Sequence, residues 1–217
     1  MSTNSALVLV AHADDETLGA GGLINKLVKN HWNVDVIIVS NGKLTVRGKI
    51  EDNAKDAYSA CKVLGCNPPI FLDFPDQYFD KFAIADIANS VNKLKLEPTL
   101  IITHIDTDLN KDHRIVCEVA KIIGRPKTRS ISILGCEIPT TSKWYGKDFN
   151  ANYYVDITEN IETKIKAFEC YKNEVQSYPG PWSSYGLKIL SEFRGLESGL
   201  KNAEAYHLIR GTDTQLP

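Results

Sequence analysis

The sequence predicts an α/β fold, a Rossmann-like three-layer sandwich with a mostly parallel sheet. Short apolar runs rich in β-branched residues alternate, over the first two thirds of the chain, with stretches whose apolar residues recur at helical spacing. Continuous apolar runs are typical of strands buried on both faces, and strands that alternate with helices form parallel sheets through right-handed crossovers. The length of 217 residues suits a single domain, which we place at residues 1–217.

The expected elements follow one another in a regular order. An apolar run at residues 6–11 precedes helical spacing at residues 18–29, and Gly65 stands where a glycine would end the helix at residues 51–64. The strand order expected for this layout is near 3-2-1-4-5, with the first and fourth strands as neighbours. We therefore expect strands at residues 6–11, 34–39, 70–72, 99–103 and 130–134, and helices at residues 18–29, 51–64, 81–94 and 112–123.

The final third of the chain has a different pattern. A short strand is expected at residues 153–156, a long helix at residues 158–174 and a last strand at residues 205–209. Residues 176–186 are rich in Pro, Gly, Ser and aromatic residues, which is typical of a loop. This part is expected to add a C-terminal helix and short strands to the sheet.

Composition and charge exclude several classes of protein. Lys and Arg number 25 and Asp and Glu number 27, so a net charge of −2 gives no general attraction to nucleic acid or to anionic membranes. No apolar run approaches the ~20 residues of a membrane span, and no basic residue precedes Lys26 as a signal peptide would require. Five cysteines, without a C-x-x-C pair, suit a reducing compartment. We expect a cytoplasmic protein that acts on a small molecule, with a homo-oligomer as one option for its assembly.

Two polar stretches follow the first and fourth expected strands. His12, Asp14 and Asp15 come directly after the first strand, and His113 belongs to a polar stretch at residues 103–114 after the fourth. Ligands of open α/β sheets bind outside the carboxyl ends of the strands, where the strand order reverses. Because the first and fourth strands flank that point, we expect the two stretches to meet in space.

Together the two stretches supply a set of two histidines and one carboxylate, His12, Asp15 and His113. Three protein ligands with one open position are typical of a catalytic zinc ion, which lowers the pKa of its water to ~7. The adjacent carboxylates Asp14 and Asp15 suit different roles, one as a ligand and the other as the base that passes a proton to a leaving amine. The pattern predicts a metal-dependent hydrolase.

The same residues resemble the signatures of the LmbE-like, or GlcNAc-phosphatidylinositol de-N-acetylase (PIG-L), family. Residues 12–22 are similar to its A-H-P-D-D-E motif, and residues 104–114 are similar to its motif T-H-x-x-x-D-x-N-x-D-H-R. Shorter matches extend the resemblance to nearly the whole chain, at residues 72–76, 137–139, 154–157, 194–195 and 203–206.

The resemblance implies a zinc-dependent hydrolase that removes an N-acyl group, usually acetyl, from an amino sugar or its conjugate. By motif position, His12, Asp15 and His113 would bind the metal and Asp14 would be the general base. Asp112, beside a ligand, would orient or polarise the site. Nitrogen and oxygen ligands of this kind also accept Fe²⁺ or Mn²⁺.

Four positions depart from the family pattern. Ala13 replaces the usual Pro, and Asn110 stands where some members have the His that stabilises the oxyanion. An amide still donates a hydrogen bond, so we expect Asn110 to take that part without carrying a proton. Asn53 and Asp56 stand where the family has Arg-x-x-Glu, so the substrate contact of that Arg is not carried over.

Further residues are candidates for substrate contact. Asp76, after the third strand, could accept hydrogen bonds from a sugar hydroxyl, and Arg47 lies in an exposed segment at residues 43–49. Trp182, in the Pro/Gly loop, suits either a wall for a sugar face or plain packing. His104, at a strand end, suits either substrate contact or support of the ligands.

Two alternative functions remain open. Asp106 and Asp108 match the D-x-D pattern of glycosyltransferases that bind a divalent metal and a nucleotide-sugar. A non-catalytic binding domain with the same fold is the other alternative, although intact residues at all expected ligand positions argue against it. The main hypothesis is an enzyme whose partner is a small N-acetylated sugar or glycoconjugate.

Overall fold

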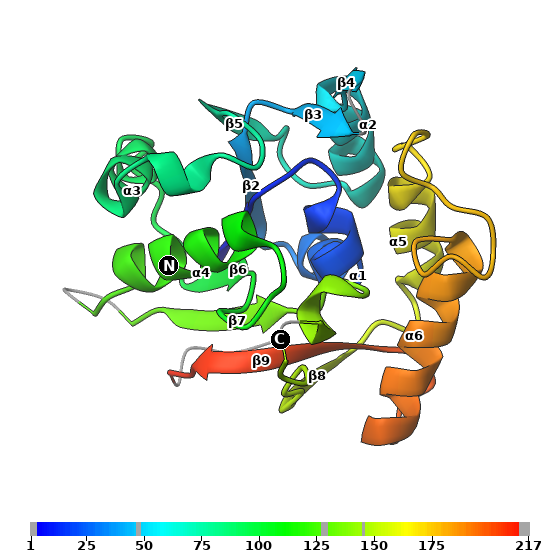
Figure 1. Ribbon diagram of the computed structural model, residues 1–217. Helices are drawn as coiled ribbons and strands as arrows, with labels where there is room; N and C mark the ends of the chain where they lie inside the picture. Colours follow the sequence, from blue (N-terminus) through cyan, green and yellow to red (C-terminus); the bar gives the residue numbers. More distant parts are fainter. Residues whose placement is uncertain (1–3, 47–48, 127–129, 145, 213–217) are drawn as a thin grey trace.

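The computed structural model describes residues 4–46, 49–126, 130–144 and 146–212 (Figure 1). Arg47, a predicted substrate contact, lies outside these ranges, and the side chains of residues 44–50 are not described. Within the described part of the chain, no helix is long and apolar enough to cross a bilayer.

A seven-stranded sheet runs through the molecule in the order β5-β2-β1-β6-β7-β9-β8. The first five strands in this order are parallel, so the predicted order 3-2-1-4-5 is confirmed. The last two strands are antiparallel to their neighbours. The strands are β1 (Ser5–Val10), β2 (Asn33–Ser40), β5 (Ile70–Phe74), β6 (Leu100–Thr103), β7 (Ser132–Cys136), β8 (Tyr153–Asp156) and β9 (Ala203–Arg210).

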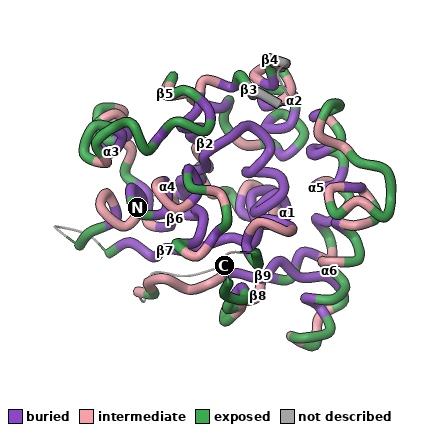
Figure 2. The backbone as a smooth tube through the Cα atoms, viewed as in Figure 1, coloured by how far each residue is buried: buried purple, intermediate pink, exposed green. Residues whose placement is uncertain are grey.

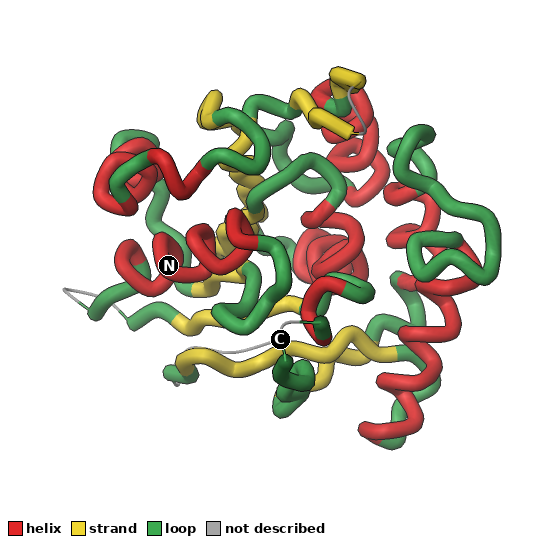
Figure 3. The backbone as a smooth tube through the Cα atoms, viewed as in Figure 1, coloured by secondary structure: helices red, strands yellow, loops and turns green. Residues whose placement is uncertain are grey.

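Helices cover both faces of the sheet, as Figures 1 and 3 show. Alternate residues of β1 face opposite layers: Val8 and Val10 pack with the cluster that contains α1, whereas Leu7 and Leu9 pack with the cluster that contains α3 and α4. This double burial explains the continuous apolar runs of the central strands (Figure 2). The helices are α1 (Asp15–Lys29), α2 (Ala54–Leu64) and α5 (Ile161–Phe168) on one face, α3 (Ile84–Asn92) and α4 (Lys111–Ile123) on the other, and α6 (Ser184–Ser198), which packs on β9.

Three expected helices are shorter than predicted because neighbouring segments adopt other structures. The first, at residues 51–64, begins at Ala54, since β4 (Lys49–Asp52) pairs with β3 (Lys43–Val46) in a separate hairpin. The second, at residues 81–94, is preceded by the short 3₁₀ helix η1 (Phe79–Lys81) and begins at Ile84. The third, at residues 158–174, ends at Phe168, beyond which the chain turns and buries Tyr171 completely.

Helix α6 was not predicted from the sequence. It contains two glycines, Gly186 and Gly195, and it directly follows a segment of loop-like composition. Its ends nevertheless have ordinary capping chemistry: Ser183 Oγ accepts the Gly186 N–H at 2.9 Å, and Gly199 closes the helix with a φ of +74°. A Cβ atom at Gly195 would lie 2.5 Å from the Leu200 carbonyl oxygen, so this glycine is needed for close packing.

One buried carboxylate joins α1 to the C-terminal part of the fold. Glu204 of β9 accepts the N–H groups of Gly22 and Leu23, both at 2.8 Å, and pairs with the buried Lys164 ammonium at 2.6 Å. Hydrogen bonds to ionised groups are the strong ones. These contacts fix helix α1 against β9 and α5. They also help to fix the first turn of α1, which comes shortly after β1.

Replacing glycines of α1 by alanine tests this close packing. A Cβ atom at Gly22 would lie 2.7 Å from Cγ2 and 2.9 Å from Cβ of Ile157. One at Gly21 would be less crowded, since its nearest neighbour would be Lys164 Cγ at 3.0 Å. Overpacking costs about 1–3 kcal/mol and Gly→Ala in a helix gains about 1 kcal/mol. We expect Gly22→Ala to lower the free energy of unfolding by about 1–3 kcal/mol and Gly21→Ala to have a smaller effect. Urea titration measures both, and equal losses would contradict the packing argument.

Candidate metal centre

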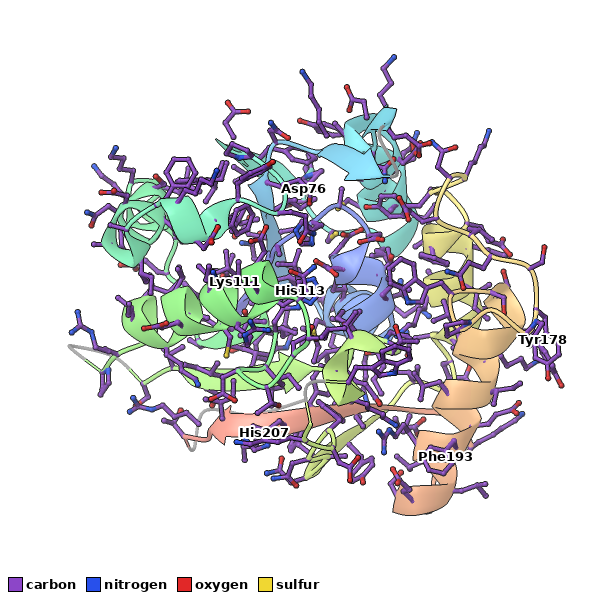
Figure 4. All side chains as sticks on the ribbon, in the orientation of Figure 1. Asp76, Lys111, His113, Tyr178, Phe193 and His207 are labelled. Atoms are coloured by element: carbon purple, nitrogen blue, oxygen red, sulfur yellow. The ribbon has the colours of Figure 1, made fainter. Side chains whose placement is uncertain are left out.

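The predicted site residues gather at the carboxyl ends of β1, β5 and β6. His12, Asp14 and Asp15 occupy the turn between β1 and α1, Asp76 follows β5, and His113 lies in the first turn of α4. These side chains are nearly inaccessible, with residue exposures between 3% and 6%. Figure 4 shows His113 near the centre of the molecule and Asp76 above it, with Tyr178, Phe193 and His207 toward its periphery. The two polar stretches therefore meet as the sequence predicted.

Three side-chain atoms form a nearly equilateral triangle. His12 Nδ1 lies 3.4 Å from Asp15 Oδ2, Asp15 Oδ2 lies 3.4 Å from His113 Nε2, and His113 Nε2 lies 3.3 Å from His12 Nδ1. A tetrahedron around a zinc ion with bonds of about 2.0–2.1 Å to N and O has edges of about 3.3–3.4 Å. The described residues therefore fit a tetrahedral metal ion with one position open to solvent or substrate.

Each histidine of the triangle has a carboxylate at its other ring nitrogen. His12 Nε2 lies 3.3 Å from Asp112 Oδ2, and His113 Nδ1 lies 3.2 Å from Asp108 Oδ1. Such carboxylates set the tautomer and the orientation of metal-binding imidazoles. Asp112 is itself held by the N–H groups of Gln77 at 2.8 Å and Phe79 at 3.2 Å. The orienting role that the resemblance implied for Asp112 thus has a direct geometric basis.

Asp108 is a site residue that the sequence analysis did not recognise. Its Oδ2 accepts the hydroxyl groups of Thr141 and Ser142, each at 3.1 Å, and its Oδ1 accepts the Asn110 N–H at 2.8 Å. Burial raises the pKa of Asp108, but the hydrogen bond and charge of His113 outweigh burial and lower the pKa. The Asp-x-Asn-x-Asp-His pattern at residues 108–113 could have identified Asp108 as a site residue. The sequence analysis instead assigned Asp108 to a D-x-D motif.

The loop that carries Thr141 and Ser142 is anchored to α6. Arg194 donates to both carboxylate oxygens of Glu137, from Nε at 2.8 Å and from Nη2 at 2.6 Å. Both residues are buried. The C-terminal part of the chain thus supports the site through Glu137, the loop and Asp108.

A second group, His12, Asp76 and Asp112, also brings potential ligand atoms together. It uses the opposite nitrogen of the same imidazole, with His12 Nε2 lying 3.1 Å from Asp76 Oδ1. Asp112 is already engaged by two backbone N–H groups, which suits support of His12 rather than metal coordination. We therefore regard the triangle with His113 as the better candidate.

Asp14 has an unusual backbone conformation and an unusual charge environment. Its φ of 130° is outside the regions that most side chains adopt, and such strain persists where the surroundings hold it. The Asp14 carbonyl accepts the N–H groups of Thr17 and Leu18, and its N–H donates to Glu16 Oε2 at 3.1 Å. Burial, followed by the charges of Asp15, Glu174 and Glu16, raises the pKa of Asp14 well above its ordinary value.

Glu16 supports the turn between β1 and α1 through the hydrogen bonds that it accepts from the Asp14 N–H and from Tyr171. It is completely buried, and its Oε1 accepts the Tyr171 hydroxyl at 2.5 Å. Burial raises the pKa of Glu16 to about 7, although the hydrogen bonds from Tyr171 and the backbone oppose that shift. Tyr171 was not identified from the sequence, because its contact with Glu16 joins distant parts of the chain.

His104 and Asn110 have clear structural partners. His104 is completely buried; its Nε2 accepts the Ala11 N–H at 3.0 Å, and its ring stacks on His113 with centroids 3.9 Å apart. Burial and the charge of His113 lower its pKa, so a neutral imidazole supports the ligands from within. Asn110 caps α4, because its Oδ1 accepts the Asp112 N–H at 2.9 Å. That bond leaves the Asn110 amide NH₂ as a donor.

Trp182 and the two carboxylates of the D-x-D pattern, Asp106 and Asp108, each have a defined partner in the structure. The Trp182 indole N–H donates to the Pro139 carbonyl at 3.0 Å, and the half-buried ring packs on the core. Asp106 is exposed and pairs with Lys121 at 2.7 Å, whereas Asp108 is completely buried on His113. These two carboxylates therefore have separate partners, which does not favour a shared nucleotide-sugar site.

Two further polar residues lie at the edge of the site. Asn53 is completely buried and donates from Nδ2 to Glu174 Oε1 at 3.1 Å. Glu174 is half-buried and close enough to Asp14 to raise its pKa. The sequence analysis did not identify Glu174, since it belongs to a segment expected to be a regular helix.

The fold and the triangle define the class of protein. An α/β sheet with a buried group of two histidines and one carboxylate, beside a carboxylate of raised pKa, is consistent with a metal-dependent enzyme. The family model for GlcNAc-PI de-N-acetylase, PIG-L, matches residues 7–123. The chain belongs to this family, and the resemblance seen in the motifs is confirmed.

Similar proteins include two that are named as deacetylases. The uncharacterized deacetylase YaiS of Escherichia coli K12 is 29% identical over 77% of this chain and 90% of its own length. The diacetylchitobiose deacetylase of Thermococcus kodakarensis is 23% identical over 94% of this chain and 83% of its own length.

Solved structures share the fold at lower identity. A zinc-inhibited form of teicoplanin deacetylase Orf2 has a TM-score of 0.75 at 14% identity, covering 97% of this chain and 100% of that one. The 4-carboxy-2-hydroxymuconate hydratase GalB of Pseudomonas putida KT2440 also has a TM-score of 0.75, at 19% identity, covering 99% and 100%. The α/β architecture predicted from the sequence is therefore confirmed by the structures of a deacetylase and of a hydratase.

Binding of a metal ion at the triangle should release protons. Burial lowers the pKa of His12 and His113, but the hydrogen bonds and charges of the surrounding carboxylates outweigh burial and raise these pKa values to about 10 and about 9. Both imidazoles are therefore protonated near neutral pH and must lose a proton to coordinate a metal.

We expect about two protons to be released per metal ion near pH 7.5, and an affinity that rises about 100-fold per pH unit there. The release should decline as the pH passes about 9 and then about 10. Calorimetric titration in buffers of different ionisation enthalpy counts the protons. An affinity that does not change with pH between 6.5 and 8.5 would contradict the charge arrangement.

Proposed function

We propose that the chain is a zinc-dependent hydrolase that removes an N-acetyl group from an amino sugar or an aminosugar conjugate. The observation that supports it most is the triangle of His12, Asp15 and His113, whose edges of 3.3–3.4 Å suit a tetrahedral ion. A zinc ion at this position would lower the pKa of a water molecule to ~7 and polarise the amide carbonyl. The donor set also suits Fe²⁺ or Mn²⁺.

Asp14 is the proposed general base. Its pKa is raised by burial and by its acidic neighbours, which brings it toward the range in which a carboxylate accepts and returns a proton efficiently. Asp14 accepts a proton from the attacking water and passes it to the nitrogen of the amide. The C–N bond then breaks, and acetate and a free amine leave.

Asn110 and Asp76 are proposed to contact the substrate. Asn110 is the N-cap of α4, three residues before His113, and we infer that its amide NH₂ donates to the developing oxyanion. Asp76, at the edge of the site 3.1 Å from His12, can accept a sugar hydroxyl. Trp182 is also proposed as a wall of the substrate site, and Arg47 is proposed as a substrate contact on the sequence alone.

The choice of deacetylation does not follow from the fold, because GalB shares the fold and is a hydratase. It follows from the family and from a base adjacent to the metal ligands. One relative is named as a deacetylase of diacetylchitobiose, and a protein with the same fold is named as a teicoplanin deacetylase. An acetylated amino sugar is therefore the substrate class proposed here.

Removing one ligand should remove the metal. We expect wild-type protein to retain about one zinc ion per chain after loading and desalting, and His113→Ala to retain almost none, because the triangle loses a corner. His207→Ala, which removes a histidine of β9 whose partner is the Asn150 carbonyl, is the matched control and should retain zinc. Elemental analysis measures the content. Equal zinc in wild type and His113→Ala would refute the ligand assignment.

Removing the base should stop catalysis without removing the metal. Asp14→Asn keeps the shape of the side chain, and Asn tolerates positive φ better than most residues. We expect kcat for amine release from N,N'-diacetylchitobiose to fall about 10²–10⁴-fold with the zinc content unchanged. Asp106→Asn removes an exposed carboxylate and should leave kcat within about twofold of wild type, since an exposed ion pair contributes little. An active Asp14→Asn enzyme would exclude the proposed role.

A further inference from the structure

Two hydrogen-bond acceptors beside the metal centre have no role in the chemistry described above. The Asn53 Nδ2–H group donates a hydrogen bond to Glu174 Oε1. The side-chain carbonyl oxygen of Asn53 therefore points away from Glu174. The Asn53 side chain is completely buried, and its Oδ1 has no hydrogen-bond partner within the described ranges. Buried polar atoms are almost always satisfied, so an unpaired carbonyl oxygen points to a donor that a ligand supplies.

The backbone holds this pair next to the site. The Asn53 N–H donates to the Gly42 carbonyl at 2.9 Å, just beyond the carboxyl end of β2, the strand that pairs with β1. Glu174 follows the turn in which the buried Tyr171 bonds to Glu16. The two acceptors therefore come from opposite ends of the sequence to the same edge of the sheet as Asp14.

The surroundings of Glu174 are negatively charged. Burial raises its pKa, the Asn53 hydrogen bond opposes that shift, and the charges of Glu51, Asp15 and Asp76 raise it further. Among the residues whose side chains are described, which leave out residues 44–50, no Lys or Arg forms an ion pair with Glu174. A half-buried carboxylate in such surroundings gains most from a cationic partner.

We propose that Asn53 and Glu174 form a subsite for a protonated amine of the substrate, next to the acetamide that is hydrolysed. The inference rests on the proposed deacetylation and makes its substrate class narrower: an N-acetylated amino sugar that also carries a free ammonium group. An ammonium has three N–H donors and no acceptor, so it can satisfy Asn53 Oδ1 and the Glu174 carboxylate together. A hydroxyl group offers a single donor and no charge, and a phosphate would meet like charge.

The test compares two ligands that differ by one acetyl group: N,N'-diacetylchitobiose and mono-N-acetylchitobiose with its amine protonated. Zinc-loaded Asp14→Asn protein is used so that binding is measured by calorimetry without turnover. We expect the amine-bearing ligand to bind about 10–100-fold more tightly, as a charge-assisted hydrogen bond would give. Adding Glu174→Gln should reduce this ratio to less than about threefold, because the amide keeps the shape and loses the charge.

Glu162→Gln is the matched control. It removes the same charge from an exposed position of α5 and should leave the affinity ratio unchanged. Equal binding of the two ligands, no binding of the amine-bearing ligand, or a preference that survives Glu174→Gln would each overturn the subsite. Acetate release by the wild-type enzyme is measured separately. Its absence with zinc bound would overturn the proposed deacetylation, whereas the binding ratio would still decide the subsite.

Discussion

The Asp15 carboxylate is the group on which the rest of the site depends. Its Oδ2 accepts the His12 N–H at 2.9 Å and lies 3.4 Å from a ring nitrogen of each of His12, His104 and His113. Burial alone would raise its pKa, but the charge and hydrogen bond of His113 hold its pKa well below the ordinary value. A buried carboxylate is stable only with such partners. Because those partners follow β1 and β6, the adjacency of these two parallel strands is the condition for the site.

Successive layers of hydrogen bonds extend from this centre to the C-terminal third of the chain. His113 lies against Asp108, and Asp108 accepts the hydroxyl groups of Thr141 and Ser142. Their loop is tied to α6 through the Glu137–Arg194 pair. Breaking such a buried pair by removing one partner typically costs about 3–5 kcal/mol. The geometry of the triangle therefore depends on residues that are far from it in the sequence and that carry no catalytic chemistry.

The sequence was sufficient for the features that local patterns determine. Double burial makes β1, β2 and β6 continuous apolar runs, and the rule for parallel sheets then brings His12 and His113 together without any knowledge of side-chain contacts. Features that rest on long-range contacts had no such signal. Glu174 reaches the site because the chain leaves its helix to bury Tyr171 on Glu16, and α6 has glycines where the packing of its neighbours leaves no room for a Cβ atom.

The departures from the family motif have a common electrostatic consequence. Asn53 stands where the family has Arg, and Asn110 stands where some members have His. Asn53 is oriented by the hydrogen bond that it donates to Glu174. Asn110 is oriented by the hydrogen bond that it accepts from the Asp112 N–H. An amide carries no positive charge to offset the carboxylates around the triangle. Burial, followed by the charges of acidic neighbours, raises the pKa of Asp14 and of Glu174. A site with this excess of negative charge favours positive charge in whatever it binds. A metal ion at the triangle would supply part of it, and a cationic group of the substrate would supply more.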